Sequence, residues 1–144
     1  MGRKASPNRA SKQNVELLRR FYESFNLGDL DAVLELCTED VEIYKDPEVL
    51  EIASASSPRG RDRVAQYLRG WLDSWSDYFA RPQEFVQLGE DVAALTQFRA
   101  RGKNSQFEIE GEMADVFTLR EGRIARFRLY VQRHDALGSL GLTA

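Results

Sequence analysis

The chain of 144 residues is 42% hydrophobic and 30% charged, which suits one globular domain with a substantial core. Its formal net charge of -3 gives no electrostatic reason to expect nucleic acid as a partner. One cysteine and one histidine exclude an internal disulfide and a histidine-rich metal site, and no apolar run approaches the roughly 20 residues of a membrane span, so we expect a cytoplasmic protein without membrane contact.

Two helices are predicted near the start of the chain. Apolar residues at three- and four-residue steps predict an amphipathic helix over residues 14–27, with Phe21 and Phe25 on its apolar side. A short second helix is predicted over residues 30–40, and it places Cys37 in the core. No histidine or lysine nearby would activate this thiol, so we interpret it as a small core residue.

A strand and a long helix follow. Alternation predicts a strand over residues 41–46, which Pro47 ends, with Tyr44 and Asp46 on the same face. A third helix is predicted over residues 60–78. Its apolar side carries an aromatic stripe that includes Tyr67, Trp71 and Trp75. Such a stripe either packs in a core or forms the wall of an apolar ligand cavity.

The remainder of the chain is typical of an antiparallel sheet. Four strands are predicted, over residues 82–88, 92–101, 106–119 and 123–133. Glu121 and Gly122 form the turn between the last two, because glycine accepts the positive φ of a two-residue hairpin. One side of the last strand is basic and amphipathic, which suits a face that meets solvent or a second subunit.

Asp115 is the unusual residue of the third predicted strand of this sheet. Met113, Asp115 and Phe117 alternate onto one face that otherwise has the pattern of a buried surface. A buried charge is costly unless it is paired or neutralised. Either Asp115 pairs with an arginine such as Arg99, or it is an unpaired carboxyl group in an apolar setting.

The domain organisation is simple. Residues 1–12 are polar and basic, and we expect them to form a flexible tail. Residues 13–138 form one domain, and residues 139–144 form a short C-terminal tail. We find no internal repeat, no metal-ligand set and no glycine loop that would hold a phosphate, so we expect no cofactor.

The element order and two motifs resemble one known fold. The predicted elements follow the order helix, short helix, strand, long helix and four strands. This order resembles that of the nuclear-transport-factor-2-like superfamily. FYESFNLGDLDAVLELCTEDVEIY is similar to the opening of its SnoaL-like branch, and DVFTLREGRIARFRLY is similar to that branch's closing hairpin. The resemblance implies an α+β, cone-shaped NTF2-like fold, in which three N-terminal helices pack on a curved, mostly antiparallel sheet that encloses a cavity.

The resemblance also implies roles for particular residues. In the ketosteroid isomerases of this superfamily, a carboxylate at the end of the first strand is the base, and that position holds Asp46 here, or Lys45 in an ungapped alignment. An aspartic acid on the penultimate strand matches Asp115, whose pKa burial would raise so that it donates a hydrogen bond. The oxyanion tyrosine of the isomerases aligns with Phe21. Tyr22 lies about 100° further round the helix, so we do not expect it to be a simple substitute.

Two hypotheses from different classes follow. The first is a cofactor-free enzyme of the isomerase or polyketide-cyclase type that acts on an apolar or aromatic carbonyl compound. Asp46 would be its base, Asp115 its acid and Tyr44 a further hydroxyl. Its ligand would contact Phe21, Phe25, Tyr67, Trp71, Trp75, Phe98, Met113, Phe117 and Leu129. The second hypothesis is a non-catalytic module of the same fold that binds a small ligand or serves as a dimeric scaffold.

Under either hypothesis we expect a homodimer through the exposed face of the sheet. The residues expected on that face are Arg99, Arg101, Arg126, Arg128, Tyr130 and Gln132. We expect His134, beyond the last strand, to be a surface residue.

Overall fold

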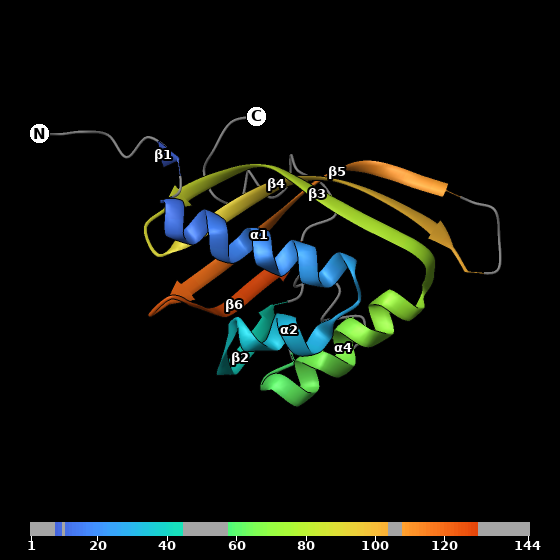
Figure 1. The fold of residues 1–144 in the computed structure, drawn as a ribbon, viewed down its shortest axis with the longest axis horizontal. Coiled ribbons are helices and arrows are strands. Elements are labelled where there is room, and N and C mark those ends of the chain that lie inside the picture. The colour runs from blue at the N-terminus through green and yellow to red at the C-terminus, as the bar shows by residue number, and fades with distance from the viewer. Residues whose placement is uncertain (1–7, 10, 45–57, 104–107, 130–144) are drawn as a thin grey trace, which may run out of the picture.

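The computed structural model describes residues 8–9, 11–44, 58–103 and 108–129 (Figure 1). Helices and strands are mixed in the first half of the chain, and consecutive strands make up the second half. The elements are β1 (Asn8–Arg9), α1 (Lys12–Asn26), α2 (Leu30–Glu35), β2 (Cys37–Tyr44), α4 (Arg61–Asp73), β3 (Trp75–Leu88), β4 (Asp91–Gly102), β5 (Glu108–Arg120) and β6 (Arg123–Leu129).

The strands of the described residues form one sheet in the order β1-β3-β4-β5-β6-β2. Neighbouring strands are antiparallel except β2 and β6, which run parallel. Helix α1 lies across one face of the sheet, and α2 and α4 lie together near its lower end in Figure 1. The α+β class and the mostly antiparallel sheet are therefore confirmed.

Helix α1 begins with a side-chain cap and buries one broad face. The Ser11 hydroxyl accepts a hydrogen bond from the Asn14 amide at 3.2 Å, which satisfies one free amide of the first turn. The buried positions follow a spacing of three, four and seven residues, as in any helix that covers a sheet. They are Leu18, Phe21, Tyr22 and Phe25.

The end of α1 is attached to β3 by one side chain. Asn26 Nδ2 donates to the carbonyl of Ala80 at 2.8 Å, and the amide of Ala80 donates to Asn26 Oδ1 at 3.0 Å. The amide side chain thus pairs with the edge of β3 as a neighbouring strand would. β1 pairs with this edge further along, at Val86 and Gln87.

Three predicted boundaries were wrong. Helix α4 ends at Asp73, and Trp75 begins β3, which the sequence analysis expected to start at residue 82. β3 pairs with β4 from Trp75 opposite Gly102 onward, and this long-range ladder outweighs the local helical spacing of the two tryptophans. Helix α2 ends at Glu35, so Cys37 lies in β2 and not in the helix. The short strand β1 was not predicted.

The core between α1 and the sheet is aromatic. Phe21 makes edge-to-face contacts with Phe117 and Phe127, with ring centroids 5.1 and 5.4 Å away. All three rings are almost completely buried, and Cys37 is buried in the same cluster as a free thiol. Among the described residues, no helix is long and apolar enough to cross a membrane.

Candidate functional site

Strand β5 carries a carboxyl group into the core. Met113, Asp115 and Phe117 alternate along it and are buried, as the sequence predicted. Asp115 is only 2% exposed. It lies opposite Ala94 of β4 in the sheet, and opposite Leu129 of β6 on the other side. Its cross-strand neighbours are therefore apolar residue types.

The partner of Asp115 is Tyr22 of α1. The Tyr22 hydroxyl donates a hydrogen bond of 2.5 Å to Oδ2 of Asp115, and both side chains are buried. The sequence analysis did not expect Tyr22 to be a simple substitute for the tyrosine that is missing at Phe21, but α1 buries both side chains and the Tyr22 hydroxyl contacts Asp115. Phe21 packs among the core rings, and Tyr22 supplies the hydroxyl.

Asp115 has no cationic partner among the residues that the structure describes. Its Oδ1 atom is buried there without a hydrogen-bond partner, and the ion pairs of this part involve other carboxylates. The predicted partner Arg99 lies opposite Glu110 in the sheet, five positions along β4 from Ala94. An odd number of positions separates opposite faces of a strand, so Arg99 projects away from Asp115 and the predicted pairing was wrong.

Burial sets the protonation of this pair. Removal from water raises the pKa of Asp115 to about 7, although the hydrogen bond from Tyr22 acts in the opposite direction. Burial, the charge of Asp115 and the shared hydrogen bond together raise the pKa of Tyr22 well above its usual value. Near neutral pH the phenol therefore keeps its proton, while Asp115 is divided between its protonated and ionised forms.

Tyr78 of β3 is a third polar group near the pair, and the sequence analysis missed it. Burial and then the charge of Asp115 raise the pKa of Tyr78 above its usual range. The electrostatic interaction with Asp115 indicates that Tyr78 lies on the same side of the sheet. The signal in the sequence is alternation, since Tyr78 and Ala80 are both directed inward once β3 begins at Trp75.

Aromatic rings continue from Tyr78 to the surface. Tyr78 contacts Phe25 at 5.7 Å and Trp71 at 6.0 Å between ring centroids, and Trp71 contacts Trp75 at 5.7 Å. Trp71 is 37% exposed, whereas the indole nitrogen of Trp75 is buried without a partner in the described part. Tyr67 is partly buried against the core. This aromatic cluster, Phe25, Trp71, Trp75 and Tyr78, contains three of the predicted ligand-contacting residues.

The remaining predicted site residues are less well placed or not described. Asp46 lies outside the described residues, and Tyr44 and Leu129 end β2 and β6 with side chains that the structure does not describe. Phe21 and Phe117 pack in the core. Within the described ranges, no group of three or more histidine, cysteine, aspartate or glutamate side chains suits a metal ion.

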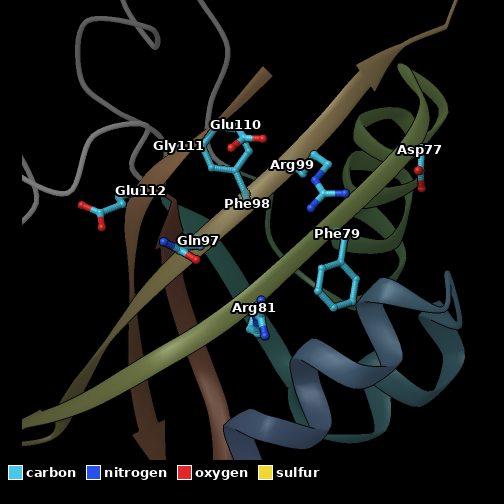
Figure 2. Close-up of a pocket in the computed structure, with 9 residues that line it drawn as sticks. All are labelled: Asp77, Phe79, Arg81, Gln97, Phe98, Arg99, Glu110, Gly111 and Glu112. Atoms are coloured by element: carbon cyan, nitrogen blue, oxygen red, sulfur yellow. The ribbon is translucent and has the colours of Figure 1, made fainter. Parts of the chain in front are cut away.

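One open pocket of about 440 Å³ lies elsewhere on the sheet and does not include Asp115 (Figure 2). Phe98 lines this pocket and also packs, partly buried, against the core. Four positions separate it from Ala94, so alternation places it on the same face of the sheet as Asp115, and its role in ligand contact stays a prediction. Phe98 lies against Gly111, where an added Cβ would be 3.4 Å from the ring. The chemistry of the buried pair and the open pocket therefore belong to different places on the molecule.

A family model for the SnoaL-like domain matches residues 18–127, which is most of the chain. The chain belongs to the SnoaL-like family. The match covers α1 to β6 and includes both Tyr22 and Asp115. Among curated proteins, none matches this SnoaL-like chain.

Solved structures share the fold of this SnoaL-like domain. An NTF2-like protein of unknown function from Burkholderia pseudomallei is 21% identical, with a TM-score of 0.73 over 89% of this chain and 97% of that one. TerC, crystallised with polyporic acid, is 17% identical, with a TM-score of 0.72 over 90% and 98%. A putative polyketide cyclase from Sinorhizobium meliloti is 17% identical, with a TM-score of 0.64 over 83% and 99%. At these identities the likeness shows the NTF2-like fold.

Proposed function

We propose that Tyr22 and Asp115 form the acid part of a cofactor-free site that transfers a proton next to the carbonyl of an apolar small molecule. The observation that carries this proposal is the 2.5 Å hydrogen bond between a phenol and a buried carboxyl group that has no cation beside it in the described residues. A carboxyl group with a pKa of about 7 is protonated in a large fraction of molecules at neutral pH. It is therefore suited to give a proton and take it back.

The two oxygens of Asp115 have different roles in this proposal. Oδ2 accepts from Tyr22, which holds the carboxyl group in one orientation. Oδ1 has no partner in the described part, so a proton on Oδ1 is available to a substrate oxygen. As the α-carbon of the substrate loses its proton to a base, the carbonyl oxygen gains negative charge, and the Oδ1–H group stabilises it. The ketosteroid isomerases are the precedent for this arrangement, since their oxyanion site also contains a tyrosine and a protonated aspartic acid.

The group that would remove the α-proton is less well defined than the Tyr22–Asp115 pair. The resemblance assigns it to Asp46, which lies outside the described residues. The aromatic cluster supports an apolar or aromatic substrate in a cavity between the helices and the sheet, because flat rings offer a large contact area to another ring system. The fold shared with TerC in complex with polyporic acid and with a putative polyketide cyclase agrees with that substrate class.

Deuterium exchange at the α-carbon of small aryl ketones tests the proposal directly. The protein in heavy water should accelerate loss of the α-proton signal, and Asp115→Asn should reduce this acceleration by about 100-fold or more. Asp91→Asn is the matched control. Asp91 also accepts a hydrogen bond from a hydroxyl group, that of Thr118 at 2.7 Å, but it is the first residue of β4. Equal exchange in the wild type and in Asp115→Asn would overturn the proposal.

A non-catalytic ligand-binding module is the second candidate. The observation that favours it is that Asp115 is 2% exposed and has no second carboxylate hydrogen-bonded to it in the described residues. Its test uses the fluorescence of Trp71 and Trp75 during titration with an aromatic ketone. Saturable quenching without any α-proton exchange would support the binding module over the enzyme.

A further inference from the structure

Most side chains that line the open pocket project from the face of the sheet opposite α1, whereas Phe98 and Gly111, which lie opposite each other in the strand register, belong to the α1 face. Tyr78 and Ala80 of β3 are directed toward α1, since Tyr78 contacts Phe25 and the backbone of Ala80 bonds to Asn26. Phe79 and Arg81 alternate with them and therefore project from the other face. The pocket residues come from β3, β4 and β5, as Figure 2 shows. They are Asp77, Phe79, Arg81, Gln97, Phe98, Arg99, Glu110, Gly111 and Glu112.

The strand register arranges these side chains in rows. Phe79 lies opposite Arg99, and Arg99 lies opposite Glu110, so a phenyl ring, a guanidinium and a carboxylate follow one another across three strands. The next row holds Arg81 and Gln97, which are also opposite each other. Side chains opposite each other on one face of antiparallel strands lie about 5 Å apart at Cβ. An aromatic, a cationic and an anionic group are therefore within reach of one small molecule.

Two charged residues of the pocket, Arg99 and Glu110, have no ion-pair partners in the described part of the chain. They are cross-strand neighbours of opposite charge, yet the ion pairs of this part join other residues. Both side chains are exposed, and the phenyl ring of Phe79 is 52% exposed beside them. The pocket therefore offers a ligand an exposed aromatic ring and charges of both signs that are not paired with each other.

We propose that this pocket binds a small aromatic zwitterion of the amino-acid type. Its ring would lie on Phe79, its carboxylate would accept the planar fork of Arg99, and its ammonium group would contact Glu110. Guanidinium groups bind carboxylates in a bidentate manner, which fixes the orientation of the ligand. A volume of about 440 Å³ fits a ligand of this size.

The pocket contains both positive and negative side chains, and this favours a zwitterion over a purely anionic or purely cationic ligand. A purely anionic aromatic compound would meet the carboxylates of Asp77, Glu110 and Glu112, which also line the pocket. A purely cationic one would meet Arg81 and Arg99. A zwitterion satisfies both signs. This inference is independent of the proposed proton transfer, because Asp115 lies on the opposite face of the sheet.

Titration calorimetry with three probes tests the inference. L-phenylalanine carries both charges, 3-phenylpropionate lacks the ammonium group, and phenethylamine lacks the carboxylate. We expect saturable binding of phenylalanine with a Kd of about 1 mM or lower, and at least about tenfold weaker binding of the other two probes. Equal affinity for all three probes, or no saturable binding of phenylalanine, would overturn the inference.

Three variants locate the site. Arg99→Gln should remove the preference for the carboxylate, and Glu110→Gln should remove the preference for the ammonium group. Arg69→Gln is the control, since it removes one positive charge from an exposed position on α4 outside the pocket. The same loss in Arg69→Gln as in Arg99→Gln would contradict a specific site. A dimer that buries this face in sedimentation experiments, together with no phenylalanine binding, would assign the face to a second copy of the chain and overturn the inference.

Discussion

The Tyr22 hydroxyl and the Asp115 carboxyl group meet in the core at 2.5 Å, although 93 residues separate them in the chain. The bond joins the only described helix that lies across the sheet to its strand β5 (Figure 1). It satisfies Oδ2 and leaves Oδ1 buried without a partner in the described part. A half-satisfied buried carboxyl group destabilises a fold, because the desolvation cost of Oδ1 is not offset by a hydrogen bond.

The stability of the protein should fall as pH rises because of Asp115. Its pKa is about 7 in the folded state against 3.8 when exposed, so the folded state binds more protons between these values. Stability from a raised carboxyl pKa is complete below the unfolded value and is lost as pH rises through the folded one. The loss is on the order of 4 kcal/mol between about pH 4 and pH 7. Urea unfolding at a series of pH values measures it.

Asp115→Asn should remove this part of the pH dependence. The amide cannot titrate, and its oxygen still accepts from Tyr22. Relative to the wild type, the variant should therefore gain stability steadily as pH rises toward 7. Asp91→Asn, at a half-buried position that begins β4, is the control for the loss of one carboxyl group. Parallel stability curves for the wild type and Asp115→Asn would show that the carboxyl group titrates normally.

Tyr22→Phe should raise the pKa of Asp115 further above 7. The Tyr22 hydrogen bond favours the ionised form and lowers the pKa, while burial raises it. Loss of the hydroxyl leaves burial unopposed. Carboxyl-carbon NMR titration measures the shift, with Asp115→Asn to assign the signal. Tyr78→Phe is the matched control, because Tyr78 does not hydrogen-bond to Asp115, and an equal upward shift there would contradict the specific role of the Tyr22 hydroxyl.

The sequence predicted Asp115 better than it predicted the partner. The alternation of Met113, Asp115 and Phe117 identifies a buried carboxyl group because a strand has a fixed period of two. A helix is less restrictive, since its buried arc spans several positions. Phe21 and Tyr22 both fall within that arc, since each lies three or four residues from both Leu18 and Phe25. Alignment with the ketosteroid isomerases places their oxyanion tyrosine at Phe21. The helical pattern by itself would also have allowed Tyr22 to face the core.

The position of Trp75 could not be predicted from local spacing. Four residues separate it from Trp71, which agrees with one helical turn, and the rings do contact each other. Trp75 is nevertheless in a strand, because β3 pairs with β4, whose partner residues lie about 25 positions later in the chain. Such long-range pairing leaves no local mark. Tyr78 was missed for the same reason, because it becomes an inward-facing strand residue only once β3 begins early.

Asn26 should be important for the attachment of α1. Its side chain makes two hydrogen bonds to the backbone of Ala80, at 2.8 and 3.0 Å, on the edge of β3 that faces away from β4 and that β1 covers only at Val86 and Gln87. Asn26→Ala leaves a backbone amide and a carbonyl without these partners, which should cost about 1–3 kcal/mol in the free energy of unfolding. Asn14→Ala is the control, since the Asn14 side chain bonds to the side chain of Gln87 and not to backbone groups, and the loss of stability should be smaller. A larger effect at Asn14 would contradict the attachment role.

Cys37 should report on unfolding through its reactivity. It is 0% exposed, and burial raises the pKa of its thiol to about 12, although Arg61 acts in the opposite direction. The reactive thiolate is therefore both hidden and rare in the folded protein. Since the chain has one cysteine, reaction with a chromogenic disulfide reagent measures this thiol alone. We expect rapid, stoichiometric reaction in denaturant and, without denaturant, a rate reduced by the fraction of molecules that open. Rapid reaction of the native protein would mean that β2 separates readily from the core.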